Sequence, residues 1–187
     1  MSRSPYKIPN EFFSFETEEP FRTCIECDRD LREKGLNYVV EKAIRNYPEY
    51  GTQDIIFDYA ICIECAFKIR QSFSHESIQR IDKFLGENMQ NLVQDKQNMD
   101  SLFLNGPDQC FITKKKRSDL LEYQIYAHCK GDFLDPMVPP YLISDKAVEM
   151  ILPLISKSTQ DILDGFFDKH FSPDPSLMNP VPKLVLV

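Results

Sequence analysis

The tetrapeptide Cys24-Ile-Glu-Cys27 recurs unchanged as Cys62-Ile-Glu-Cys65, with 34 residues between the two copies. Two cysteines separated by two residues fit a tight turn, or knuckle, in which both thiolates reach one tetrahedral ion at about 2.3 Å. Two knuckles supply four ligands and leave no coordination position for water, which is typical of a structural site. The spacing therefore predicts one zinc ion per chain, bound by Cys24, Cys27, Cys62 and Cys65.

The sequence around the knuckles predicts two strands followed by helix. Residues 37–44 and 54–61 are rich in β-branched and aromatic residues, and residues 46–53 carry the turn-forming residues Asn, Pro and Gly. Beyond Cys65, apolar residues recur every three to four positions, which predicts two helices or one bent helix over residues 63–98. The order is thus a knuckle, a strand pair, and a second knuckle at the start of a helix.

This order of elements resembles the treble-clef zinc finger. In that fold group the last two metal ligands come from the first turn of the helix, the positions that Cys62 and Cys65 occupy here. The resemblance covers about residues 20–75 and departs at Asp28, where the family frequently has glycine. It implies a small zinc-stabilised unit, for which a two-stranded zinc ribbon is the main alternative. Treble clefs serve nucleic-acid, protein and lipid binding as well as catalysis, so the resemblance names no function.

Parts of the second half of the chain resemble the first. The matched segments are Tyr59-Ala-Ile-Cys62 with Tyr126-Ala-His-Cys129, and residues 74–84 with residues 156–166. An insertion of 15 residues, which the proline-rich stretch around 133–147 can supply, joins the two matches. The same comparison pairs Cys110 with Cys24 and puts Asp132 in the place of a lost ligand. Two interpretations are open, a degenerate metal-free copy and a chance resemblance.

If the copy is genuine, Cys110, Cys129 and Asp132 are candidate ligands of a weak second metal site. Two thiolates without firm further ligands rarely hold an ion, because each missing ligand removes binding free energy. The alternative is that both cysteines are buried as small apolar residues in a metal-free unit.

The pattern predicts an α+β fold built from a small zinc-stabilised unit and a second α+β unit. In the second unit we expect a strand over residues 120–127, a loop over 131–143, a helix after Ser144 and another from the capping box Ser158-Thr-Gln-Asp161. The predicted divisions are an N-terminal extension, 1–19; the four-cysteine unit with its C-terminal helices, 20–100; the second α+β unit, 101–172; and a proline-rich tail, 173–187.

Charge disfavours general binding to nucleic acid. The chain has 22 Lys and Arg against 29 Asp and Glu, a net charge of −7, whereas phosphate neutralisation needs a basic excess. The one basic run, on a predicted turn, is the candidate nucleic-acid contact; it consists of Lys114, Lys115, Lys116 and Arg117. A solvated turn that discourages strand pairing explains the same run.

The sequence predicts a non-enzymatic protein. It contains no zinc-protease H-E-x-x-H, no phosphate-binding P-loop and no G-x-S-x-G nucleophile turn. No apolar run approaches the roughly 20 residues that span a bilayer, and no signal-peptide core follows Met1, so we expect a cytoplasmic protein away from membranes. In a reducing compartment the six cysteines favour metal binding over disulfides.

The function expected from these features is an adaptor or regulatory module that binds protein. The candidate surfaces are the aromatic N-terminal arm around Phe12, Phe13 and Phe15, and the tail segment 184–187, which could instead dock on the protein's own sheet. The first alternative is a nucleic-acid-binding zinc finger that uses the Lys114–Arg117 turn. The second alternative is a thiol redox sensor.

Overall fold

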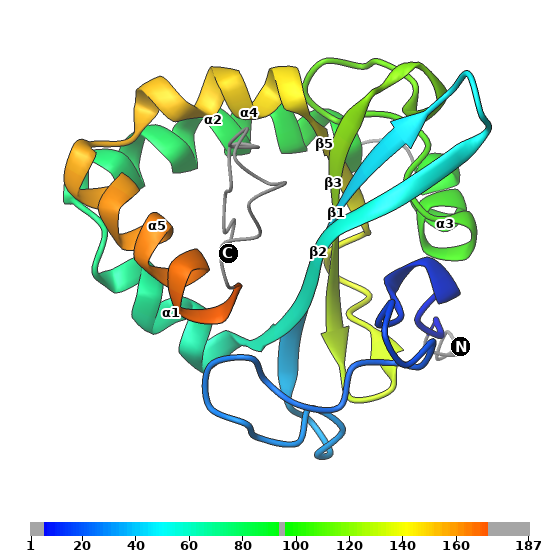
Figure 1. The fold of residues 1–187 in the computed structure, drawn as a ribbon, viewed down its shortest axis with the longest axis horizontal. Helices are drawn as coiled ribbons and strands as arrows, with labels where there is room; N and C mark the ends of the chain where they lie inside the picture. Colours follow the sequence, from blue (N-terminus) through cyan, green and yellow to red (C-terminus); the bar gives the residue numbers. More distant parts are fainter. Residues whose placement is uncertain (1–5, 94–95, 172–187) are drawn as a thin grey trace.

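The protein is built on one five-stranded antiparallel sheet (Figure 1). The computed structural model describes residues 6–93 and 96–171, and the tail segment 184–187 lies outside them. The strands run in the order β2-β1-β3-β4, and β5 pairs with β3 beside β4. Their bounds are β1 Asn37–Tyr47, β2 Thr52–Cys62, β3 Glu122–Lys130, β4 Phe133–Leu134 and β5 Tyr141–Ser144. Strands from both halves of the chain therefore share one sheet, joined where β1 pairs with β3.

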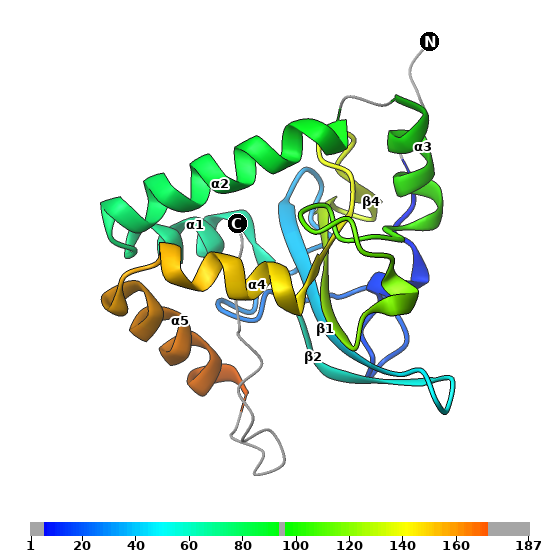
Figure 2. The same ribbon diagram turned by 90° about the horizontal axis from the view of Figure 1, so that it is seen from above.

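Helices cover one face of this sheet, and the N-terminal segment with α3 covers the other (Figure 2). The helices are α1 Ile63–Gln71, α2 His75–Val93, α3 Lys96–Asn105, α4 Asp145–Ile151 and α5 Lys157–His170, with short 3-10 helices at Asn10–Phe12, Arg117–Asp119 and Leu152–Leu154. The expected α+β class is thereby confirmed. Within the described ranges, no helix combines the length and the apolar character that crossing a membrane requires.

Strand β1 is buried on both faces over seven consecutive residues, 38–44, two of which are the charged Glu41 and Lys42. Glu41 points to the helical face, where the hydroxyls of Tyr59 and Tyr126 contact its carboxyl group. Lys42 points to the opposite face, where it donates to the carbonyl of Phe13 and pairs with Asp58 at 3.6 Å. Successive residues of a strand alternate between faces, so adjacent charges are buried in separate layers.

The N-terminal arm is part of the folded core and not only an extension. Phe12 is fully buried, and Tyr6 stacks on Phe103 of α3 at a centroid distance of 4.5 Å. Phe12 and the half-buried Phe13 belong to the candidate partner-binding surface of the arm, but they pack against the protein's own core. Phe15, with 68% of its surface exposed, is the one of the three that stands free of it.

Several predicted boundaries are wrong by a few residues. Helix α5 begins at Lys157 with Ser156 as its N-cap, two residues before the expected capping box, because Ser156 Oγ accepts from Thr159 N at 3.2 Å. Strand β5 lies partly in the segment expected to be a loop. Its two preceding prolines are compatible with an edge position, where no ladder hydrogen bond is lost. The helix after Ser144 is confirmed, with Ser144 as its N-cap.

Candidate metal centre

The four predicted cysteines come together in one cluster. Their sulfur atoms all lie within 4.8 Å of one another, and Cys27 Sγ lies 3.9 Å from Cys62 Sγ. Four sulfurs held at about 2.3 Å by one tetrahedral ion stand about 3.8 Å apart, so the spacing fits such an ion. Cys24, Cys62 and Cys65 are buried and Cys27 is exposed. The cluster can therefore bind a metal ion with three protected ligands and one at the surface.

The first knuckle is a tight hairpin closed by backbone hydrogen bonds. Cys24 N donates to Arg29 O at 3.0 Å, and Asp28 N donates to Cys24 O at 2.9 Å. Asp28 has φ of 57°, in the left-handed region that favours glycine. Aspartate tolerates this region better than most residues, because its short polar side chain can hydrogen-bond locally. The missing glycine thus leaves the turn intact.

The second knuckle lies where β2 runs into α1. Cys62 is the last residue of β2 and the N-cap of α1, and Cys65 is in the first turn of that helix. Cys62 N donates to Cys24 Sγ at 3.3 Å, and Ile25 N donates to Ala60 O at 2.9 Å. These two bonds fix the first knuckle against the end of β2, so the strand and the helix start together position all four thiols.

The surroundings of three of the thiols shift their pKa values. Burial raises the pKa of Cys24 and of Cys65, whereas the hydrogen bond from the backbone of Arg29 lowers the pKa of the exposed Cys27. Without a cation the neutral form is therefore favoured for the thiols of Cys24 and Cys65. A divalent ion reverses this preference, because it binds thiolates and compensates their charge.

The acidic residue inside each knuckle is paired with cations. Glu26 contacts Lys169 and lies 2.6 Å from His170 Nε2, and Glu64 pairs with Arg29 at 3.0 Å. Burial raises the pKa of Glu26, but the hydrogen bonds from Lys169 and His170 outweigh this effect and lower the pKa below its ordinary value. The end of α5 is thus tied to the first knuckle, and both knuckle carboxylates have cationic partners.

The candidate second site is not assembled. Cys110 lies beside Leu142 and Ser144 of β5, which pair with Ile125 and Tyr123 of β3, whereas Cys129 lies four residues beyond Ile125, toward the other end of β3. Asp132 lies in the turn after β3. Among the described residues, only the four-cysteine cluster brings three or more candidate ligands together. The structure therefore does not bring Cys110, Cys129 and Asp132 together.

The basic run does not act as one patch. Lys114, Lys115 and Lys116 are exposed, but Arg117 is paired with Glu11 and its guanidinium lies 5.0 Å from the centre of the Tyr123 ring. Three cations remain at the surface, and the fourth holds the N-terminal arm on the sheet.

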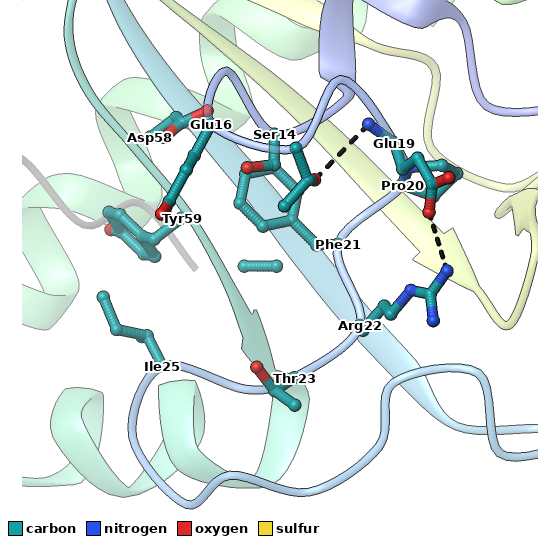
Figure 3. Close-up of a pocket in the computed structure, with 12 residues that line it drawn as sticks. Ser14, Glu16, Glu19, Pro20, Phe21, Arg22, Thr23, Ile25, Asp58 and Tyr59 are labelled. Atoms are coloured by element: carbon teal, nitrogen blue, oxygen red, sulfur yellow. Dashed lines mark hydrogen bonds and ion pairs between the residues drawn. The ribbon is translucent and has the colours of Figure 1, made fainter.

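A cavity that has no signal in the sequence lies beside the first knuckle (Figure 3). Its volume is about 440 Å³. Its walls come from the arm between Ser14 and Arg22, from Thr23 and Ile25 of the knuckle region, and from residues 58–60 of β2. Figure 3 shows Glu16 and Asp58 on one side of Phe21 and the Glu19–Arg22 ion pair on the other.

No protein-family model, curated protein or solved structure matches this chain.

Proposed function

We propose that the protein is a zinc-stabilised, non-enzymatic interaction module, an adaptor or regulator that binds a segment of another protein in the cavity beside the first knuckle. The observation that carries the proposal is the position of Ile25. It lies between two ligands of the closed thiol cluster and also lines the cavity. A metal that fixes the knuckle thereby fixes one wall of the binding surface.

Zinc is the ion that the donor set favours. Four thiolates in a closed cluster match structural Zn²⁺ sites, whereas calcium and magnesium take oxygen ligands. The knuckle, hairpin and helix arrangement, with Cys62 as N-cap and Cys65 in the first helical turn, supports a treble-clef unit over a zinc ribbon. When bound, the ion supplies cross-linking and no open coordination position, which supports a structural role.

The cavity favours an extended, basic and partly apolar partner. Phe21, Ile25 and Ala60 offer apolar surface, and Glu16 has no cationic partner among the contacts of the described residues. The adjoining strand β2 is the outer strand of the sheet on this side. An extended segment can follow such an edge and place a Lys or Arg against Glu16 while apolar side chains cover Phe21.

The test uses a display library of random heptapeptides, selected on the zinc-loaded protein under reducing conditions. We expect enriched peptides to carry a basic residue next to an aliphatic or aromatic one. The best peptide, measured by fluorescence anisotropy, should bind Glu16→Lys about tenfold more weakly, because the new lysine repels the basic residue of the peptide and a cost of about 1.4 kcal/mol corresponds to a factor of ten. The matched control is Glu87→Lys, on the exposed surface of α2.

Two outcomes would overturn this function. One is a library that yields no sequence that binds the wild type better than it binds Glu16→Lys. The other is a salt-dependent shift with mixed DNA and RNA oligonucleotides that disappears when the Lys114–Arg117 run is neutralised, which would favour nucleic acid as the ligand.

A further inference from the structure

The turn that holds Cys110 repeats the first knuckle bond for bond. Its fifth residue, Lys114, has φ of 60°, against 57° for Asp28 in the knuckle. The paired hydrogen bonds are Cys24 N to Arg29 O (3.0 Å) with Cys110 N to Lys115 O (2.9 Å), and Asp28 N to Cys24 O with Lys114 N to Cys110 O (both 2.9 Å). Lysine has no special tolerance for the left-handed region, so the shared conformation is imposed by the turn and not by the residue.

The strand end beside this turn repeats the second knuckle. Strand β5 ends at Ser144, the N-cap of α4, as β2 ends at Cys62, the N-cap of α1. Ser144 N donates to Cys110 Sγ at 3.3 Å, the same distance that separates Cys62 N from Cys24 Sγ. Ser144 therefore stands where the third ligand stands in the first half.

The two remaining ligand positions are matched as well. Thr113 Oγ1 lies 3.2 Å from Ser144 Oγ, where the first half has two cysteine sulfurs 3.9 Å apart. Ala147, fully buried three residues after Ser144, takes the place of the fourth ligand. The set corresponding to the four cysteines is Cys110, Thr113, Ser144 and Ala147.

The helices that follow obey the same correspondence. Ser74 caps α2 and Ser156 caps α5. The two helix starts also exchange hydrogen bonds, since Ser74 N donates to Thr159 Oγ1 at 3.0 Å and Ser156 N donates to Ser77 Oγ at 2.8 Å. A constant offset of 82 residues relates the third ligand, the fourth ligand and the cap Ser74 to Ser144, Ala147 and Ser156. The first two positions have an offset of 86, so the segment between position 113 and Ser144 is four residues shorter than its counterpart, in contrast to the 15-residue insertion that the alignment through Cys129 needs.

From these matches we infer that the second half is a copy of the metal unit in which hydrogen bonds have replaced the metal, leaving a latent tetrathiolate zinc site at positions 110, 113, 144 and 147. The inference rests on the proposed zinc site of the first half. The Thr113–Ser144 hydrogen bond and the two backbone bonds to Cys110 Sγ hold the turn against the helix start. An ion bound by four cysteines here would displace the thiol protons and make the same cross-links.

The test restores the site with the triple variant Thr113→Cys, Ser144→Cys, Ala147→Cys. Purified under reducing conditions with excess Zn²⁺ removed, it should carry one metal ion more per chain than the wild type. Replacing Zn²⁺ by Co²⁺ should double the thiolate-to-cobalt absorption of tetrahedral sites. The matched control replaces Ala147→Cys by Val148→Cys, which has the same number of thiols but points the third one elsewhere along α4, and should gain no metal.

A folded triple variant with no more metal than the wild type overturns the inference. A wild type without metal beside a triple variant with one ion refutes the proposed zinc site and leaves the latent site standing. If the triple variant does not fold, a variant with the reverse substitutions in the first half provides the test. Cys27→Thr, Cys62→Ser, Cys65→Ala gives the first half the hydrogen-bonded set, and should be folded and metal-free; an unfolded N-terminal half in this variant overturns the inference.

Discussion

Replacing Glu41 by glutamine should remove a large part of the pH dependence of stability. Glu41 lies in the middle of β1 and only 2% of its surface is exposed. The Tyr126 hydroxyl lies 3.1 Å from Glu41 Oε1 and 2.7 Å from Gln124 Oε1, and one hydroxyl proton cannot serve both. A proton on the Glu41 carboxyl supplies the donor that the other of these contacts needs. Burial correspondingly raises the pKa of Glu41 to about 8, against an ordinary value of 4.5.

The magnitude follows from proton linkage. A folded-state pKa above the unfolded one means that folding takes up a proton, so this contribution to stability is complete below pH 4.5 and is lost as the pH rises through 8. The free energy of unfolding should fall by at most about 1.4 kcal/mol per pH unit across that window, or roughly 3–4 kcal/mol from pH 5 to pH 8. The amide introduced by Glu41→Gln is a neutral group of nearly the same shape and has no such loss.

The assay is urea denaturation of wild type and Glu41→Gln from pH 5 to pH 8.5, followed by far-ultraviolet circular dichroism. Both proteins have the same metal site, so its own pH dependence cancels in the difference between them. The variant should gain roughly 3–4 kcal/mol relative to the wild type between pH 5 and pH 8, and Glu87→Gln should gain nothing. A stability difference that stays constant across this range would refute a buried, protonated Glu41.

Two further substitutions test the knuckle and the arm. Asp28→Gly should keep or slightly raise the melting temperature and Asp28→Ala should cost about 1 kcal/mol, because φ is 57° and only glycine adopts it freely; equal melting temperatures for the two variants would contradict the left-handed turn. Arg117→Ala should cost about 3 kcal/mol in urea denaturation, because it leaves the mostly buried carboxylate of Glu11 without its cation, and Lys115→Ala should change nothing; equal effects of the two would show that Arg117 is an ordinary surface residue.

The metal cluster could be predicted from the sequence because its signal is local. Two cysteines at fixed spacing make a knuckle almost regardless of their surroundings, and strands and helices follow from periodicity. The cap at Ser144 was also readable, since a serine before an apolar helical pattern is a typical N-cap. In each of these features, the residues that determine the structure lie close together in the sequence.

The register of the second unit could not be read in the same way. The sequence comparison matched cysteine to cysteine and so chose Cys129, whereas the residue that donates its backbone N–H to Cys110 Sγ, as Cys62 does to Cys24 Sγ, is Ser144, the counterpart that we infer. A ligand replaced by a hydroxyl residue keeps the backbone geometry and loses the sequence identity. The cavity and the pairing of Glu26 with α5 escaped prediction for a related reason, since both join segments far apart in the chain.

The metal content of the purified protein, measured by elemental mass spectrometry with protein quantitation under reducing conditions, tests the zinc site itself. We expect one zinc ion per chain in the wild type. Cys62→Ser should carry none and lose amide-exchange protection in β2 and α1, and Cys129→Ala should keep its single ion. A folded wild-type protein without metal, or a Cys62→Ser variant with unchanged metal content and melting temperature, would contradict the zinc site.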